Sequence, residues 1–116
     1  MHFGETVMIS NETKEELISG LQNIFRDKLV SIILYGSMAR GDADDESDID
    51  IAFIIRSGIE DDEKNSFLKW NAALDLKYGR VFSIVDIDKD TMDKWGAVVP
   101  YFRNINSEGV VLWKAA

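Results

Sequence analysis

Two aspartates separated by a single residue carry the strongest chemical signal in the sequence. Asp48 and Asp50 stand at the start of an apolar run, residues 49–55, which predicts a strand. Residues two apart on a strand point to the same face, so the two carboxylates project side by side. Such a pair repels itself unless a cation lies between its members, and Mg²⁺ is commonly held by one or two carboxylates together with substrate phosphates. The spacing therefore predicts a divalent metal site.

A glycine-serine pair precedes the aspartates. Gly36 and Ser37 directly follow a continuous run of aliphatic residues, 29–35, which predicts a strand buried on both faces. Glycine lets the backbone turn sharply and approach a ligand closely. The free N–H groups of such a turn can hold a phosphate, and the serine hydroxyl adds a donor. Either motif alone is common, but their combination at this spacing predicts a site for a metal-bound phosphate compound.

The segment from Asp42 to Asp50 holds six carboxylates and no positive charge. A solvated acidic loop accounts for its first four carboxylates. A calcium-binding EF-hand loop does not fit, because the glycine and glutamate that it needs are missing whether the loop begins at Asp42 or Asp44. The phosphate-binding pattern Gly-x-x-x-x-Gly-Lys-Ser/Thr does not occur either. A simple acidic binder of Mg²⁺ or Ca²⁺ is the weakest of the remaining alternatives.

Gly36-Ser37, ten further residues and then Asp48-Ile49-Asp50 resemble the Gly-Ser-x10-Asp-x-Asp signature of the polymerase-β-like nucleotidyltransferase superfamily. The small size of the chain and the whole stretch 35–50 are similar to the minimal nucleotidyltransferases (MNT), the antitoxin-like partners of HEPN-domain proteins. A weaker likeness continues through residues 101–105 and 108–113.

This resemblance implies an α/β core with a mixed sheet, two metal ions and the transfer of a nucleoside monophosphate, with ATP as the expected substrate. Gly36 and Ser37 would hold the triphosphate, and Arg40 would add a charge-assisted contact to it. Asp48 and Asp50 would bind Mg²⁺ and act as catalytic residues. Alternatively, Arg40 is a solvated side chain whose charge balances the acidic loop.

The family usually adds a third carboxylate from a later strand, and here two assignments stay open. By alignment that position falls on Ser83, which would leave the site with two carboxylates. In the other register Asp86 completes the site, and we take Asp86 as the third catalytic residue. Strand alternation puts the two residues on opposite faces, so only one of them can serve.

Composition narrows the class of protein. The chain has 116 residues, a formal net charge of −8 and a pI of about 4.5, so a broad basic surface for nucleic acid is not expected. It has no cysteine and a single histidine, His2, which exclude thiol chemistry and multi-histidine metal sites. No apolar run is long enough to span a membrane and no signal peptide is recognisable, so we expect a cytoplasmic protein.

Helical and strand patterns alternate along the chain, which predicts an α/β (α+β) fold in which helices pack on a mixed sheet of about four strands. We expect one domain over residues 1–116, with Asp90 as the cap of the helix expected at 91–95. The expected helices are 11–28, 61–78, 91–95 and 99–106; the expected strands are 29–35, 48–56, 81–87 and 110–113; residues 36–47 are expected to form a loop with at most one helical turn.

Two functions follow from the motif and the resemblance. The first is an Mg²⁺-dependent nucleotidyltransferase that moves AMP from ATP to a protein or another hydroxyl acceptor, in a toxin–antitoxin-like pair with a HEPN protein. The second is a catalytically weak or inactive scaffold of the same fold that acts as a partner-binding antitoxin module. At 116 residues we expect no separate acceptor-binding domain, so the acceptor surface would come from a partner or from a second copy of the chain.

Overall fold

A mixed five-stranded sheet forms the centre of the structure, a computed structural model that describes residues 2–3, 9–41 and 48–116. The strands are β1 (His2–Phe3), β2 (Leu29–Tyr35), β3 (Ile49–Ile55), β4 (Phe82–Asp88) and β5 (Val110–Lys114). Their order across the sheet is β1-β5-β2-β3-β4. β2 runs antiparallel to β3 and β5, whereas β4 is parallel to β3 and β1 is parallel to β5. The predicted fold class is confirmed; the two-residue strand β1 was not predicted.

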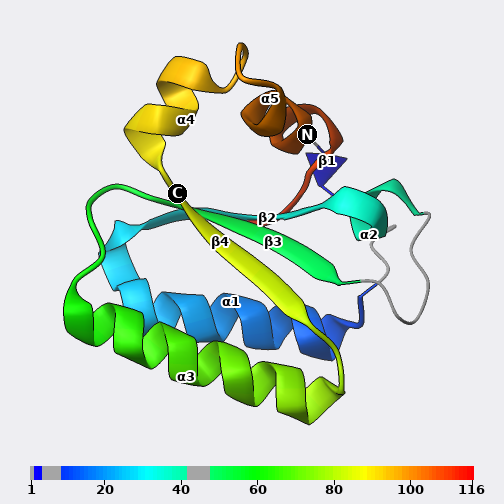
Figure 1. Cartoon of the computed structure of the whole chain (residues 1–116), viewed down its shortest axis with the longest axis vertical. Coiled ribbons are helices and arrows are strands. Elements are labelled where there is room, and N and C mark those ends of the chain that lie inside the picture. The colour runs from blue at the N-terminus through cyan, green and yellow to red at the C-terminus, as the bar shows by residue number, and fades with distance from the viewer. Residues whose placement is uncertain (1, 4–8, 42–47) are drawn as a thin grey trace.

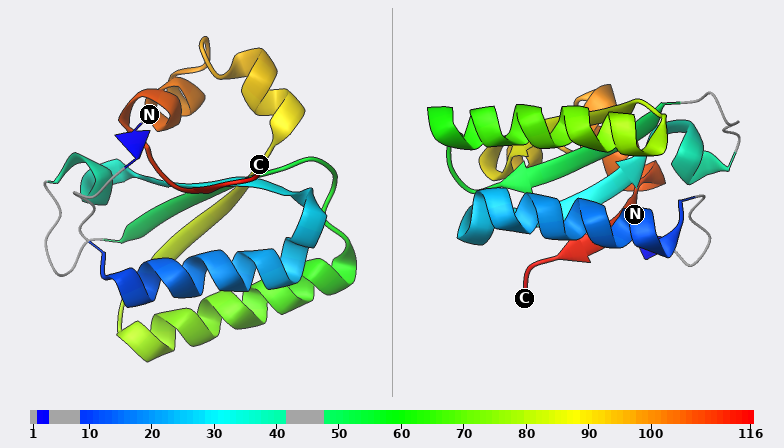
Figure 2. Two further views of the ribbon diagram at one scale, coloured as in Figure 1. Left: turned by 180° about the vertical axis from the view of Figure 1, so that it is seen from behind. Right: turned by 90° about the horizontal axis from the view of Figure 1, so that it is seen from below.

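The helices lie in two layers on either side of the sheet (Figure 1). α1 (Asn11–Phe25) and α3 (Asp61–Tyr78) cover one face, while α4 (Lys89–Trp95) and α5 (Pro100–Glu108) lie on the other. The short helix α2 (Gly36–Arg40) projects from the end of β2, as both views of Figure 2 show. None of the helices in the described part of the chain is long and apolar enough to cross a membrane.

Local capping explains where the two long helices begin. The Ser10 hydroxyl accepts a hydrogen bond from the Thr13 N–H at 3.1 Å, which satisfies one of the free donors at the start of α1. Glu60 and Glu63 form a reciprocal capping box at the start of α3. α1 ends at Phe25 and a separate 3-10 turn follows over 26–28, so the prediction of one continuous helix to residue 28 was wrong at that end.

The two smaller helices differ from the predictions at their ends. Asp88 caps α4, because its carboxylate accepts hydrogen bonds from the N–H groups of Asp90 and Thr91 at 3.1 and 3.3 Å. The assignment of the cap to Asp90 was therefore wrong, and α4 begins two residues earlier than expected. α5 begins at Pro100, whose missing N–H costs nothing in a first turn, and continues to Glu108 rather than 106.

Alternation along β3 separates two apolar cores and fixes which side chains face which helices. Ile51 and Phe53 face α1 and α3, whereas Ala52 and Ile54 face α4 and α5. Asp50 is in phase with Ala52 and Ile54, so its carboxylate belongs to the α4–α5 face at the end of the strand nearest α2.

Candidate active site

Gly36 and Asp50 are in direct contact at the junction of β2 and α2. Gly36 has a φ of +72°, in the left-handed region that favours glycine. A Cβ atom added to Gly36 would lie 2.3 Å from Oδ2 of Asp50, which is closer than real Cβ contacts. The absence of a side chain at Gly36 therefore lets the carboxylate lie directly on the turn that was predicted to hold phosphate. Ser37 follows as the second residue of α2 and is half-buried.

Ser83 is the residue that β4 places beside the two aspartates. In the parallel pair of β3 and β4, Ser83 lies opposite Asp50. Its hydroxyl is 3.5 Å from Oδ2 of Asp48, at the outer limit of a hydrogen bond. Asp48, Asp50 and Ser83 thus form one group at this end of the sheet.

Asp86 does not join this group. It lies opposite Phe53 in the same strand pair, and Phe53 is part of the core under α1 and α3. Because side chains alternate along a strand, Asp86 is on the opposite face of the sheet from Ser83 and Asp50. The register that would have let Asp86 complete the metal site is wrong, and the third position is occupied by Ser83.

The surroundings of Asp50 disfavour the charged form of its carboxylate. Burial raises the pKa of Asp50 above its ordinary value, and the negative charge of Asp48 raises it further. The positive charge of Arg40 acts in the opposite direction and has the smallest effect of the three. A divalent cation between the two carboxylates would remove both penalties, so the electrostatics of the pair favour a bound cation.

Arg40 lies at the end of α2, near the predicted phosphate turn. Its Nη1 atom is 3.4 Å from Oε2 of Glu108 on α5, and both side chains are nearly half-exposed. Such an exposed ion pair contributes little to stability. The loss of this ion pair would cost little, which is compatible with the predicted contact of Arg40 to nucleotide.

A tyrosine pair beside Asp50 was not predicted as part of the site. Tyr35 lies opposite Asp50 in the β2–β3 pair, and its hydroxyl is 3.2 Å from that of Tyr101 on α5. Burial, the hydrogen bond to Tyr101 and the charge of Asp50 all raise the pKa of Tyr35. Tyr35 borders the motif, but nothing in the sequence relates it to a residue 66 positions away.

The donor set at Asp48 and Asp50 fits Mg²⁺, which takes one or two carboxylates and completes its shell with phosphate oxygens and water. Among residues 2–3, 9–41 and 48–116, no group of three or more acidic, histidine or cysteine side chains could hold a metal. The four acidic side chains of residues 42–47 lie outside the described residues. Within the described part, this end of the sheet thus offers two carboxylates to a cation.

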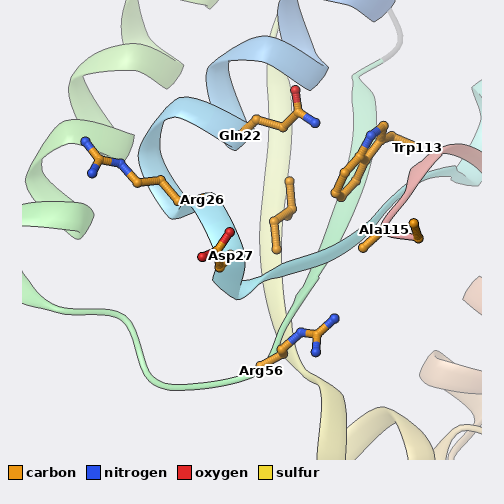
Figure 3. Close-up of a pocket in the computed structure, with 8 residues that line it drawn as sticks. Gln22, Arg26, Asp27, Arg56, Trp113 and Ala115 are labelled. Carbon is orange, nitrogen blue, oxygen red and sulfur yellow. The ribbon is translucent and has the colours of Figure 1, made fainter.

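A separate hollow at the other end of the sheet shares no residue with this site (Figure 3). It has a volume of about 510 Å³ and includes Trp113, Arg56 and Gln22 in its lining. Arg26 also lines this hollow, with its guanidinium group pointing away from Trp113 in Figure 3. The chemistry of the motif therefore lies at the α2 end of the sheet, and not in this hollow.

Comparison with known proteins gives the class. The family model described as Polymerase beta, Nucleotidyltransferase matches residues 15–113, a range that contains all the predicted site residues. The chain belongs to this family. Two proteins of Methanocaldococcus jannaschii, each named as a proposed protein adenylyltransferase, are similar to it. One is 35% identical over 68% of this chain and 76% of the relative; the other is 33% identical over 89% and 99%.

Solved structures share the fold. A toxin–antitoxin complex with AMP-PNP contains a chain with a TM-score of 0.61 and 20% identity, over 88% of this chain and 73% of the other. A complex of tri-AMPylated HEPN toxin with MNT antitoxin from Shewanella oneidensis contains a chain with a TM-score of 0.57 and 17% identity. The match covers 92% of this chain and 74% of the other. A spectinomycin adenyltransferase of Enterococcus, solved with ATP and spectinomycin, has a TM-score of 0.61 and 17% identity. The match covers 72% of this chain and 36% of the other. At these identities the likeness establishes the fold.

Proposed function

We propose that the chain is an Mg²⁺-dependent adenylyltransferase that moves AMP from ATP to a hydroxyl group of a HEPN-type partner protein. The observation that carries the proposal is the contact of the Asp50 carboxylate with the Gly36 turn. It brings a metal-binding carboxylate against backbone able to hold phosphate. The names of the archaeal relatives and the complexes among the structural neighbours support AMP as the group and a HEPN protein as the acceptor.

The chain's own residues bind and orient the nucleotide in this reaction. The Gly36 turn and the Ser37 hydroxyl hold the triphosphate, and Asp48 and Asp50 fix the cation that neutralises it. The acceptor oxygen forms a bond to the α-phosphorus, the bond from that phosphorus to the bridging oxygen breaks, and pyrophosphate leaves. The acceptor proton passes to water, since Ser83 and not a carboxylate lies opposite Asp50 on β4. Bound Mg²⁺ supplies charge stabilisation to the transferring and leaving groups.

A second candidate function is a partner-binding module with weak or no catalysis. Ser83 opposite Asp50 favours it, since a serine there replaces the carboxylate that would otherwise assist the acceptor. Positioned acid–base help contributes typically about 10²–10⁴-fold in rate. The same nucleotide site would then serve to hold ATP, and inhibition of the partner would follow from coverage of its surface.

A transfer assay with labelled ATP and a purified HEPN partner distinguishes the adenylyltransferase from the partner-binding module. With Mg²⁺ present, we expect label to appear on the partner from ATP labelled at the α-phosphate and not from ATP labelled at the γ-phosphate. The double variant Asp48→Asn/Asp50→Asn should lose the transfer, while Asp86→Asn, which removes one carboxylate charge on the other face of the sheet, should retain it.

Label from the γ-phosphate, or equal transfer by the double variant, would contradict the adenylyltransferase assignment. Tight binding to the partner with no label from either position would favour the partner-binding module. The removal of Mg²⁺ with a chelator should abolish transfer in the first case and leave partner binding intact in the second.

A further inference from the structure

The α4–α5 face of the sheet contains a hollow that the site chemistry does not use. The two helices on this face, α4 and α5, are short, with seven and nine residues (Figure 1). A hollow of about 390 Å³ remains between α4, α5 and strands β2, β3 and β5. This volume lies within the range of small-molecule sites in proteins, about 300–1,000 Å³.

The floor of the hollow is apolar. Ile54, Met92 and Val111 line it and are 7%, 7% and 8% exposed. By contrast, Ile51 and Phe53, which face the α1–α3 core, are fully buried. The floor residues are therefore buried from bulk solvent and yet accessible from the hollow, so an apolar ligand would gain stabilisation by covering them.

The rim supplies polar groups without partners. Ser31 lines the hollow and is 7% exposed, and its hydroxyl has no hydrogen-bond partner among the described residues. Lys114 lies opposite Ser31 in the β2–β5 pair and likewise has no ion-pair partner there. Because Ser31 lines the hollow, its hydroxyl can donate a hydrogen bond to a ligand oxygen there.

The charge at the rim is positive in a chain with a net charge of −8. Lys89 also lines the hollow, but it forms an ion pair with Asp93 at 2.5 Å on α4. Since Asp93 neutralises Lys89, the ammonium group of Lys114 carries the net positive charge of the described rim. A ligand carboxylate could take a charge-assisted bond from Lys114 and a second bond from the Ser31 hydroxyl.

The roof of the hollow is held in place. The side-chain amide of Asn106 on α5 donates a hydrogen bond to the carbonyl oxygen of Gly96 at 3.2 Å and also contacts the sulfur of Met92. These contacts join the two helices above the hollow, so the cavity is formed before a ligand arrives.

We infer that the hollow under α4 and α5 is a binding site for a small organic carboxylate with an apolar body, such as a medium-chain fatty acid. The apolar body lies on Ile54, Met92 and Val111, and the carboxylate lies at Lys114 and Ser31. The inference does not depend on the adenylyltransferase proposal, because the site is remote from Asp48 and Asp50 in the lining it uses.

Methyl NMR spectra of the whole chain, titrated with sodium octanoate, test the inference. We expect saturable shifts at the methyl groups of Ile54, Met92 and Val111. Acetate, which lacks the apolar body, should cause none, and 1-octanol, which lacks the charge, should bind at least fivefold more weakly. Lys114→Met should raise the octanoate Kd at least fivefold, while the matched control Lys69→Met, an exposed lysine on α3, should leave it unchanged.

Shifts that do not saturate, equal affinity for octanol, or equal Kd values for the two lysine variants would each overturn the inference. Ser31→Leu provides a second arm, because the added side chain should fill the hollow and abolish octanoate binding while the melting temperature is kept. Octanoate binding that survives in folded Ser31→Leu protein would place the ligand elsewhere.

Discussion

Asp50 combines a predicted catalytic role with a cost to the fold. Its raised pKa means that the folded chain binds the Asp50 proton more tightly than the unfolded chain does. The native state is therefore stabilised at pH values below the ordinary aspartate pKa, and this stability is lost as the pH rises through the raised folded pKa. At neutral pH and without a cation, the ionised carboxylate destabilises the chain.

We therefore predict that Asp50→Asn raises the melting temperature at pH 7 in the absence of metal, because it removes the burial and repulsion of the charge. In native protein, Mg²⁺ with ATP should raise the melting temperature, and in the variant it should not. Thermal unfolding at pH 4 and pH 7 measures both effects. A variant that melts lower than native protein at pH 7 would show that the Asp50 charge is stabilising.

A second prediction separates the backbone from the side chain in the phosphate turn. Gly36→Val should abolish ATP binding, because its Cβ would collide with the Asp50 carboxylate and because φ is +72° there. Ser37→Ala removes one hydrogen bond, worth about 0.5–1.5 kcal/mol, and should weaken binding about 2- to 13-fold. Calorimetric titration of ATP with Mg²⁺ measures both. An unchanged affinity for ATP in folded Gly36→Val protein would contradict the role of this turn in phosphate binding.

At the scale of elements, the register of β4 decides what the site can do. We predict that Ser83→Asp adds a third carboxylate beside Asp48 and increases AMP transfer by about 10²-fold or more, since positioned acid–base help has that magnitude. The Mn²⁺ affinity should also rise, which can be measured by electron paramagnetic resonance without any turnover. As a control on the other face of the sheet, Asp86→Asn should alter neither quantity.

The strands also show which features can be predicted from the sequence and which cannot. The apolar runs of β2 and β3 follow from short-range pattern alone, and they placed Gly36 and Asp50 correctly at strand ends. The face of a β4 residue depends on which backbone groups of β3 it pairs with, and the sequence around Ser83 allowed both registers. The contact between Tyr35 and Tyr101 arises only when α5 folds back over the sheet.

For the whole molecule, the two faces of the sheet are unequally supported. Among the described residues, the core under α1 and α3 has sixteen buried members, whereas the core under α4 and α5 has six. We predict that amide hydrogens in α4 and α5 exchange through local opening at a lower free energy than those in α1 and α3. Hydrogen exchange followed by mass spectrometry on peptides checks this. Equal protection of all four helices would contradict it.

β4 has a neighbour on one side alone within the described sheet, because the strand order ends with it. An unpaired strand border can recruit the same strand of another molecule and begin aggregation. Asp86 is exposed on this border. When two copies approach along it, their aspartates add like-charge repulsion that opposes a continuous intermolecular sheet. Asp86, which does not join Asp48 and Asp50, thus adds a negative charge that opposes edge-to-edge association of β4.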